Sequence, residues 1–429
     1  MSEEKDKQGR PIVAVTGMGV VSSLGQGKAE NWRKLTAGES GIHKISRFPI
    51  AGLRTCIAGT VDFLPESSAG ASVLSETLAR LSAIEAVEQA GLEPENFGGR
   101  LVLAAPPMEL DWKNRFALDN FARQHWGSDC PPPSYPLLLA ECRRHKHEAF
   151  FNTTQFGHIA ERLGRDFGTC GLPVSLSTAC ASGATAIQMG AEAIRRGEKR
   201  VLVIAADGSV SAEALIRFSL LSALSTHNDP PEKASKPFSK DRDGFVMAEG
   251  SGALVLESLD NALARGAEIW GIVAGCGETA DDFHRTRSQP DASPAIGAMR
   301  AAMADAGIGI DDIDYINAHG TSTPENEKME YLAMSTVFGN ALPHIPVSSN
   351  KSMIGHTLTA AGAIEAVFSL LTIRDGIIPP TINYDKPDDT IPLDVVPNHS
   401  RNKPVSLVFS NSFGFGGQNS SLVLKAYKM

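Results

Sequence analysis

The sequence predicts an α/β protein built from two similar halves, residues 1–258 and 259–429, each with a sheet covered by helices. The first observation is that apolar, β-branched runs alternate with Ala-rich helical patterns along the 429 residues. The second is that an Ala-rich helix ending in Ala-Gly occurs once in each half, and the third is that a glycine-bounded helix also recurs. Alternating strands and helices are typical of largely parallel sheets with helices packed on their faces.

Each half opens with a similar strand. Residues 11–19 (PIVAVTGMG) and 269–277 (IWGIVAGCG) both indicate a strand that runs into a glycine turn. A later apolar strand also recurs, at 100–104 and at 315–318, each time after a short acidic loop. The repeated order indicates that the chain arose by duplication.

The helix between these two strands is repeated as well. Residues 83–92 read AIEAVEQAGL and residues 299–308 read MRAAMADAGI. We expect Gly91 and Gly307 to end these helices in the left-handed conformation, which glycine adopts without steric strain.

The first half is the longer one, chiefly because of residues 105–155. This stretch contains two proline runs, at 106–107 and 131–133, and the basic run RRHKH at 143–147. We interpret it as an inserted excursion, and long excursions of this kind are often functional.

A second helix recurs later in each half. Its bounding glycines are Gly183 and Gly197 in one half and Gly362 and Gly376 in the other, which are 14 residues apart in both. Helices of Ala/Gly-rich composition are common. Matches in the same order across both halves nevertheless favour duplication over chance.

The composition indicates a globular protein. Hydrophobic residues make up 42% and charged residues 21% of the chain, close to globular averages, and the net charge of −9 argues against broad, non-specific binding to nucleic acid. The N-terminus is polar, and no window offers about 18 consecutive apolar residues. We therefore expect a cytoplasmic protein without a membrane span.

The cysteines are scattered and form no Cys-x-x-Cys pair, which suits neither a disulfide framework nor a zinc site. They lie at positions 56, 130, 142, 170, 180 and 276.

Cys180 has the most informative setting. The β-branched run that starts at residue 174 stops at a small-residue turn carrying this cysteine, and a helical pattern then runs to Gly197. The thiol is thus expected at a helix N-terminus, where free N–H groups and the helix dipole stabilise anions and lower a thiol's pKa. A free cysteine is more often a small buried hydrophobe, so the assignment depends on other segments.

Three further segments carry chemically useful side chains. The first, NAHGTSTP (317–324), places His319 at a strand end, where ligands bind in parallel-sheet proteins. The second, SSNKSMIGH (348–356), places a lysine and a histidine five residues apart in a loop that opens the repeated helix. The third, NSFGFGGQN (411–419), is glycine-rich but lacks the Gly-Lys-Ser/Thr ending of a phosphate loop. Read singly, each could be an ordinary structural loop.

Together these segments resemble the β-ketoacyl-acyl carrier protein synthases of the elongating class I/II, within the thiolase superfamily. The resemblance extends from about residue 11 to residue 425. It implies a thiolase-like fold of two pseudo-duplicated halves in a five-layered αβαβα arrangement, which agrees with the internal repeats. The matching motifs are TACASG with Cys180, KDRDGF (240–245), HGTSTP with His319, KSMIGH with Lys351 and His356, and NSFGFGG with Phe413 and Phe415.

The resemblance implies a decarboxylative Claisen condensation, the activity of a 3-oxoacyl-acyl carrier protein synthase. Cys180 would attack an acyl thioester and hold the acyl chain, which divides one difficult step into two. A malonyl thioester would then lose CO2, and N–H donors on His319 and His356 would stabilise its enolate oxygen. The backbone N–H groups of Cys180 and Phe415 would form the oxyanion hole for the acyl carbonyl.

Other residues have supporting roles by the same resemblance. Lys351 would balance charge and set the protonation of the histidines, paired with Glu365 on the second repeated helix. Thr321 and Thr323 match residues that bind the phosphopantetheine arm. Phe415 would be the gate to the acyl pocket, with Phe413 in the same loop.

The resemblance also implies partners. Substrates would be carried on the 4′-phosphopantetheine of an acyl carrier protein, a homodimer is expected, and no metal or organic cofactor is implied. The family has a glycine-rich stretch where this chain has AAPPM (104–108), and the helix at 74–90 carries a single basic residue, Arg80. The basic run at 143–147 would then replace this helix as the docking site for the carrier protein. One interpretation is that the enzyme works with a specialised carrier and on long or very-long acyl chains. HGTSTP continues as Glu-Asn-Glu, which we interpret as a variation at a helix start.

Three alternatives stay open to different degrees. A polyketide or nodulation-type ketosynthase shares all the catalytic motifs. A non-catalytic chain-length partner subunit lacks the nucleophile, so Cys180 argues against it. An enzyme of the thiolase or ketoacyl synthase III type lacks the KSMIGH segment and fits less well. Acyl chain length, carrier identity and pathway are not determined by the sequence.

Overall fold

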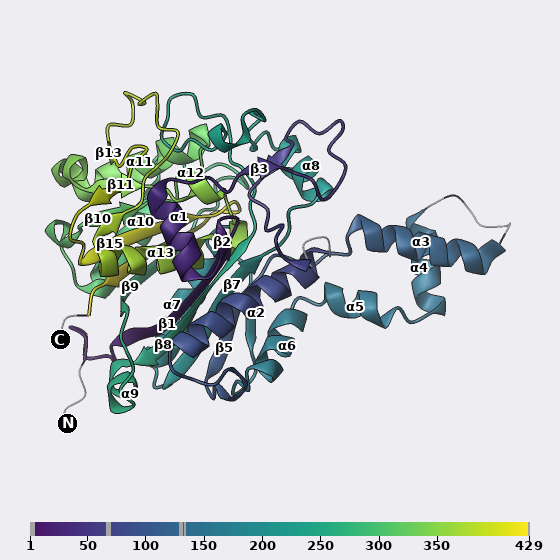
Figure 1. Cartoon of the computed structure of the whole chain (residues 1–429), viewed down its shortest axis with the longest axis horizontal. Helices are drawn as coiled ribbons and strands as arrows, with labels where there is room; N and C mark the ends of the chain where they lie inside the picture. Colours follow the sequence, from purple (N-terminus) through teal and green to yellow (C-terminus); the bar gives the residue numbers. More distant parts are fainter. Residues whose placement is uncertain (1–4, 66–69, 128–131, 133, 428–429) are drawn as a thin grey trace.

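The computed structural model describes residues 5–65, 70–127, 132 and 134–427, so Cys130, Pro131 and Pro133 of the sequence analysis lie outside the described residues (Figure 1).

The same five-strand arrangement occurs in both halves. In the first half the strand order across the sheet is β6-β5-β7-β8-β1. Its strands are β1 (Val13–Ser22), β5 (Arg100–Ala104), β6 (Val174–Leu176), β7 (Arg200–Asp207) and β8 (Gly250–Ser258).

The second half repeats this topology strand for strand. Its order is β11-β10-β15-β16-β9, so both halves read third, second, fourth, fifth, first along the chain. Its strands are β9 (Gly271–Ala280), β10 (Tyr315–Asn317), β11 (Pro346–Ser348), β15 (Leu407–Phe413) and β16 (Gln418–Lys425). The halves join where β1 pairs with β9. The repeats in the sequence thus correspond to a repeat in topology.

The sheets are mixed, and the expectation of largely parallel sheets was wrong in this respect. The pairs β5–β6, β5–β7, β10–β11 and β10–β15 are parallel, whereas β8 and β16 run antiparallel to both of their neighbours. Only residues 414–417 separate β15 from β16, and so short a connection can join antiparallel strands only.

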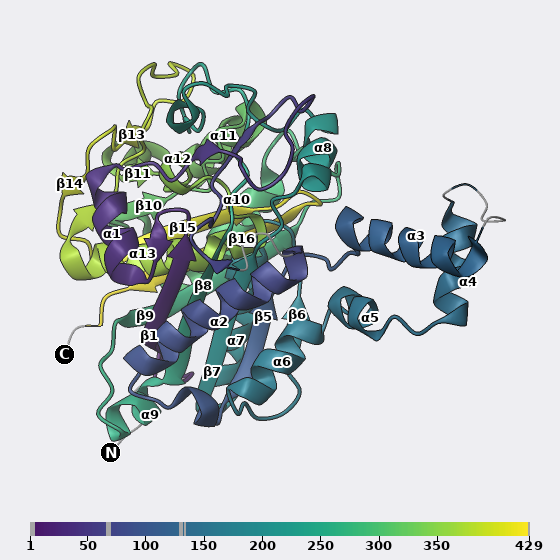
Figure 2. The same ribbon diagram turned by 45° about the vertical axis from the view of Figure 1, so that its right-hand side comes forward.

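The helices form three layers around the two half-sheets, as the five-layered expectation required. α2 (Ala71–Gln89) and α6 (His158–Asp166) cover the outer face of the first half, and α10 (Ser293–Ala306) and α11 (Pro324–Phe338) lie on the outer side of the second. α7 (Ser182–Arg195) and α13 (Ala361–Asp375) each contact strands of both halves and form the central layer. Figure 2 shows α7 and α13 behind the strands that α2 covers.

Two equivalent glycines bring the central helices into contact. A Cβ atom on Gly183 of α7 would lie 2.5 Å from the backbone nitrogen of Ala363, and one on Gly362 of α13 would lie 2.5 Å from that of Ala184. No side chain fits at either position. α13 is buried from Ala361 to Thr372, so its N-terminus and that of α7 are fixed beside each other.

The glycines of the opening strands were predicted to form turns, and this was wrong. Gly17 lies inside β1 and Gly275 inside β9. Cβ atoms on them would lie 1.9 Å from the carbonyl oxygen of Ala86 in α2 and 2.4 Å from that of Ala302 in α10. The glycines let each helix pack directly on its strand. The predicted left-handed glycines after α2 and α10 are confirmed, with φ of +68° at Gly91 and +62° at Gly307.

The excursion of the first half forms a helical arm. α3 (Trp112–Trp126), α4 (Tyr135–Arg144) and α5 (Glu148–Thr154) project from the body of the molecule in both views (Figures 1 and 2). The remaining short elements are β2 (Gly25–Gln26), α1 (Lys28–Ala37), β3 (His43–Lys44), β4 (Ile57–Ala58), α8 (Ala212–Leu220), α9 (Leu259–Ala264), α12 (Lys351–Ile354), β12 (Ile377–Ile378), β13 (Asp394–Val395) and β14 (Arg401–Asn402).

Candidate active site

Cys180 lies in the tight connection between β6 and α7, at the helix N-terminus that the sequence predicts. Ala179, just before it, has φ of +49°, which is uncommon for a residue with a side chain. The turn is held by Ser182, whose Oγ accepts a hydrogen bond from the Thr178 N–H (2.8 Å) and donates one to the Ala179 carbonyl oxygen (2.6 Å). The thiol is therefore presented in a fixed direction.

The expected lowering of the thiol pKa is wrong for this structure. Burial raises the pKa of Cys180 to about 11, although a hydrogen bond from the Phe415 backbone N–H and the charge of Lys351 oppose this rise. Desolvation disfavours the thiolate more than the helix N-terminus and these partners favour it. Cys180 is thus a neutral thiol at neutral pH.

His319 follows β10 at the carboxyl end of the strand. Its backbone N–H and that of Gly320 donate to the two carboxylate oxygens of Glu330 in α11, at 2.8 and 2.9 Å. Burial raises the pKa of Glu330, and these two N–H groups oppose the rise. Asn326 and Asn411 also donate to this carboxylate, at 3.2 and 3.3 Å. Glu330 thereby fixes the loop that carries the histidine.

Sequence reasoning missed Glu330. The signal was the acidic run that follows HGTSTP, which we interpreted only as a variation at a helix start. The interpretation holds for the helix, because α11 begins at Pro324 and the Thr323 side chain accepts from the Asn326 N–H (3.2 Å) as its N-cap. It did not reveal that two carboxylates of this helix, Glu327 and Glu330, are buried against the HGTSTP loop.

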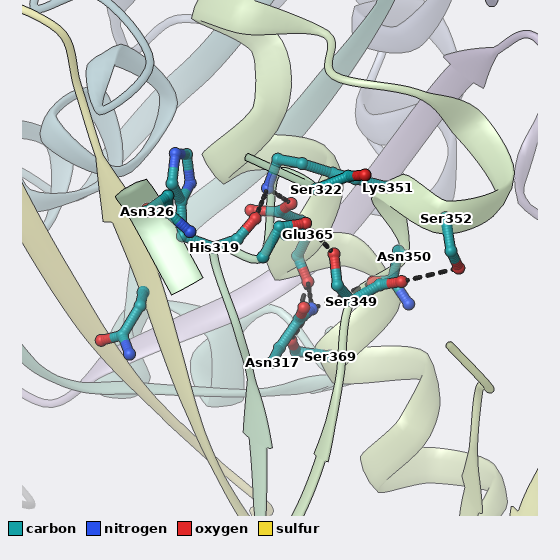
Figure 3. Close-up of polar contacts among 12 residues, drawn as sticks. Asn317, His319, Ser322, Asn326, Ser349, Asn350, Lys351, Ser352, Glu365 and Ser369 are labelled. Carbon is teal, nitrogen blue, oxygen red and sulfur yellow. Dashed lines mark hydrogen bonds and ion pairs between the residues drawn. The ribbon is translucent and has the colours of Figure 1, made fainter. Parts of the chain in front are cut away.

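Lys351 is buried beneath the HGTSTP loop. Its Nζ donates to the main-chain carbonyl oxygen of His319 (2.6 Å) and forms an ion pair with Glu365 of α13 (Figure 3). Burial raises the pKa of Glu365 to about 7, with the charge of Lys351 opposing the rise. The predicted partnership of Lys351 with Glu365 is thus present in the structure as a direct contact.

His356 and His319 face one another in the same cavity. Their ring centroids are 5.3 Å apart at an interplanar angle of 84°, and both side chains are buried. Burial, reinforced by the positive charge of Lys351, lowers the pKa of both histidines well below the usual value. Both rings are therefore neutral at physiological pH, each with one N–H donor.

The glycine-rich loop closes the cavity from the side of β15 and β16. Phe413 is the last residue of β15, and its ring lies edge-on to His319 with centroids 5.8 Å apart. Phe415 packs against an apolar cluster that includes Cys180. A Cβ on Gly414 would lie 3.0 Å from the Thr178 carbonyl oxygen and 3.2 Å from the Cys180 nitrogen. Glycine at this position lets the loop approach Cys180 closely.

A cavity of about 290 Å³ brings the predicted residues together. Thr321 and Thr323 both line it, and their hydroxyl groups are 3.0 Å apart. Lys351 and Glu365 lie behind its wall rather than on it. The sequence did not single out several other lining residues, namely Phe218, Asp281, His284, Arg287 and Met329. The predicted lining residues are Cys180, His319, Thr321, Thr323, His356, Phe413 and Phe415.

Comparison with known proteins agrees with this fold. The model of the β-ketoacyl synthase N-terminal domain matches residues 11–262, and that of the C-terminal domain matches residues 270–385. The chain belongs to the β-ketoacyl synthase family.

Two of its relatives carry the same name. The 3-oxoacyl-[acyl-carrier-protein] synthase 2 of Coxiella burnetii is 37% identical over 419 residues, which cover 96% of this chain and 98% of that protein. The protein of the same name from Vibrio cholerae is 35% identical over 422 residues, covering 96% and 98%.

Solved structures give the same result. A β-ketoacyl synthase from Burkholderia phymatum has a TM-score of 0.82 at 30% identity, covering 97% of this chain and 100% of that one. A type II polyketide ketosynthase bound to its acyl-carrier protein, AntDE:AntF, has a TM-score of 0.84 at 31% identity with the same coverage. Among the described residues, no helix has both the length and the apolar character needed to cross a membrane.

Proposed function

We propose that this β-ketoacyl synthase elongates acyl chains as a 3-oxoacyl-acyl carrier protein synthase. The observation that carries the proposal is that Cys180, His319 and His356 line one cavity, with the Phe415 backbone N–H directed at the Cys180 sulfur. The names of the relatives from Coxiella burnetii and Vibrio cholerae support the same reaction.

The first step is acyl transfer to Cys180. The sulfur bonds to the acyl carbonyl carbon, the bond from that carbon to the donor sulfur breaks, and the thiol proton ends on the released thiol. Negative charge develops on the carbonyl oxygen during this step. The backbone N–H groups of Cys180 and Phe415 are the donors for it, and such preorganised donors typically lower the barrier by about 2.7–4 kcal/mol each.

The second step joins the two substrates. A malonyl thioester loses CO2, and the enolate oxygen accepts hydrogen bonds from His319 and His356. The enolate carbon then bonds to the acyl carbonyl carbon, and the bond to the Cys180 sulfur breaks. Cys180 takes up one proton, so acyl-enzyme, malonyl thioester and a proton give 3-oxoacyl thioester, CO2 and the free thiol. The chain's own groups suffice, with no metal or organic cofactor in either step.

The cavity mouth suits a phosphopantetheine arm. The hydroxyl groups of Thr321 and Thr323 can hydrogen-bond its amides, and Phe415 with Phe413 can admit or block the acyl chain. Gly416 and Gly417, with φ of +89° and +94°, give the loop backbone conformations that most residues avoid. An acyl carrier protein is the partner that would present this arm. The proposal places the enzyme in the cytoplasm together with that carrier.

A homodimer is part of the proposal. β6 ends the strand order of its sheet, and an uncovered sheet edge is a pairing surface. Large apolar side chains are exposed near it and on the arm, where a second copy would cover them. They include Phe116, Tyr135, Phe151, Leu172 and Val174.

Intact-protein mass spectrometry tests the function. The protein is incubated with acyl carrier proteins loaded with acyl groups from medium to very long. A saturable acyl adduct on Cys180, followed by 3-oxoacyl product when malonyl carrier is added, is expected. The longest accepted chain distinguishes general elongation from a specialised long-chain role, and poly-β-keto products would indicate a polyketide synthase. Absence of any adduct would contradict the proposal.

A further inference from the structure

The helical arm of α3, α4 and α5 buries few apolar side chains of its own. Among its described residues, Leu118 and Ala122 of α3 and Leu137 of α4 are buried hydrophobics, whereas Phe116 and Phe151 are exposed. Units of about 40 residues rarely bury enough apolar surface to be stable alone and commonly use a disulfide, a metal or a partner. A second copy covering Phe116 and Phe151 would be one such element, and a metal ion bound within the arm would be another.

A buried carboxylate inside the arm marks a place where such an element could bind. Glu141 of α4 is 0% exposed. Its Oε1 is 3.2 Å from Nε2 of His147 and 3.4 Å from Nδ1 of His125. Its Oε2 is equally buried but has no hydrogen-bond partner among the described residues. A buried carboxylate oxygen without a partner is costly, so this oxygen indicates a missing ligand.

Two imidazoles lie next to this carboxylate. The rings of His125 and His145 are stacked, with centroids 4.1 Å apart at 21°. Neutral imidazole nitrogens and a carboxylate oxygen are the donor set that Zn²⁺ and its neighbours in the first transition row prefer. One such atom each from His125, Glu141 and His145 lies within 4.8 Å of the others.

We propose that His125, Glu141 and His145 bind a divalent first-row transition metal ion of the Zn²⁺ type. Glu141 lies in the last turn of α4, and His145 directly follows that helix, with its backbone N–H donating to the Glu141 carbonyl oxygen (3.0 Å), while His125 reaches them from α3. Tetrahedral bonds of about 2.0–2.2 Å need ligand atoms roughly 3.4 Å apart. His125, with its side chain 42% exposed, and His145, at the end of α4, can shift to close that distance.

His147 is a positioning residue for this site. Its Nε2 contacts Glu141 Oε1, and its ring also contacts the rings of Phe121 (centroids 5.5 Å apart) and Phe150 (5.9 Å). A hydrogen bond of this kind orients a ligating carboxylate. Because His147 precedes α5, the ion would connect α3, α4 and the start of α5. The cysteine pattern predicted no zinc site, and this one uses no cysteine: it combines His145, which the sequence analysis had assigned to a basic run, with His125, which it had not singled out.

The site is separate from the catalytic cavity. None of its three ligands lines that cavity. Of the basic residues that flank His145, Arg144 is directed away, since its guanidinium lies over the Trp126 ring, 4.4 Å from its centroid. The proposed role is therefore structural. It does not depend on the proposed condensation.

Zinc binding to the full-length protein, purified without a histidine tag and stripped with a chelator, tests the proposal. Competition with a chromogenic zinc chelator is measured for the wild type, the double variant H125Q/H145Q, and H344Q, which changes an exposed histidine outside the arm. The wild type and H344Q should each bind one equivalent of Zn²⁺ at this site. The double variant should bind this Zn²⁺ at least about 100-fold more weakly, and H147Q about tenfold more weakly.

A second readout on the wild type alone keeps the test independent of the variants' folding. Zn²⁺ should slow proteolysis within residues 112–154, and Co²⁺ should give the visible absorption of a tetrahedral site. Zinc held at Cys180 and the catalytic histidines would remain in the double variant, so it cancels in the comparison. Equal zinc binding by the wild type and the folded double variant, or no zinc-dependent protection of the arm, would overturn the proposal.

Discussion

Lys351 Nζ donates a hydrogen bond to the main-chain carbonyl oxygen of His319, 2.6 Å away, while its charge is paired with Glu365. The cation therefore connects α13 of the central layer to the loop that carries His319. It holds that loop in place and, as a nearby positive charge, contributes to the lowered pKa of both His319 and His356.

Replacing Lys351 by Met should destabilise the fold by about 3–5 kcal/mol, because it leaves Glu365 buried without its partner. The loss relative to the wild type should grow as pH rises above about 7, because ionisation of Glu365 is then nearly complete in the wild type, whereas the carboxyl of the variant, with its higher pKa, still opposes folding as it ionises. The folded-state pKa of Glu365 is already raised to about 7 from 4.5, so its ionisation opposes folding as pH rises, and removing the cation raises this pKa further. Urea unfolding from about pH 5 to pH 8 measures the effect, with a slope of at most roughly 1.4 kcal/mol per pH unit for one group. The double variant K351M/E365M should recover much of the stability; no recovery would show that the ion pair is not the cause.

Cys180→Ala should abolish both acyl-enzyme formation and elongation, because no other described cysteine lines the cavity. Cys276→Ala is the matched control, since Cys276 is also buried but lies in β9 and outside that cavity. Mass spectrometry of each protein measures acyl-enzyme formation, and a product assay measures elongation. Elongation by the Cys180 variant above a few per cent of wild type would contradict the covalent mechanism.

His356→Ala should impair decarboxylation more than acyl transfer. The imidazole is placed to donate to the enolate oxygen, and loss of one such donor typically costs about 2.7–4 kcal/mol, or roughly 100- to 1000-fold in rate. CO2 release from malonyl carrier and acylation of Cys180 are measured on the same preparation. Equal losses in both would argue against this role.

The fold was predictable where the signal is local and repeated. The helix ends at Gly91 and Gly307 and the strand at 100–104 were all found correctly. The opening glycines were misread because their requirement is not local. Gly17 and Gly275 have no side chain because a helix far along the chain packs on them, and no pattern within the strand itself reveals this.

The site was predictable from motifs, but its electrostatics were not. The sequence places Cys180 at a helix N-terminus, which lowers a thiol pKa. The extent of burial nevertheless decides whether the pKa is raised or lowered overall, and burial is a property of the packed structure. Glu330 was missed for a similar reason. A glutamate in an acidic helix is usually solvated, and only the fold shows this one accepting from the His319 N–H.

Gly183→Ala should strongly destabilise the protein. The added methyl group would meet the backbone nitrogen of Ala363 at 2.5 Å, and backbone at the centre of two packed helices cannot move without disturbing both. Gly297→Ala in α10 is the control, because its nearest neighbour is the Thr279 side chain at 3.2 Å and alanine favours a helix by about 1 kcal/mol. Thermal unfolding should show a large loss for the first and little change for the second. Similar melting temperatures would show that the contact between α7 and α13 is not close.

Alkylation of Cys180 by iodoacetamide should accelerate throughout the accessible alkaline range. With the pKa raised by burial to about 11, the reactive thiolate is a small fraction at neutral pH and rises about tenfold per pH unit below the pKa. Rates for the free enzyme, measured by mass spectrometry from about pH 7 to pH 9, should therefore increase without a plateau, and a small exposed thiol of ordinary pKa should level off sooner under the same conditions. A plateau below about pH 8 would show that the helix N-terminus and the Phe415 N–H outweigh desolvation. Acyl transfer would then start from a preformed thiolate, and no proton would have to leave Cys180 during that step.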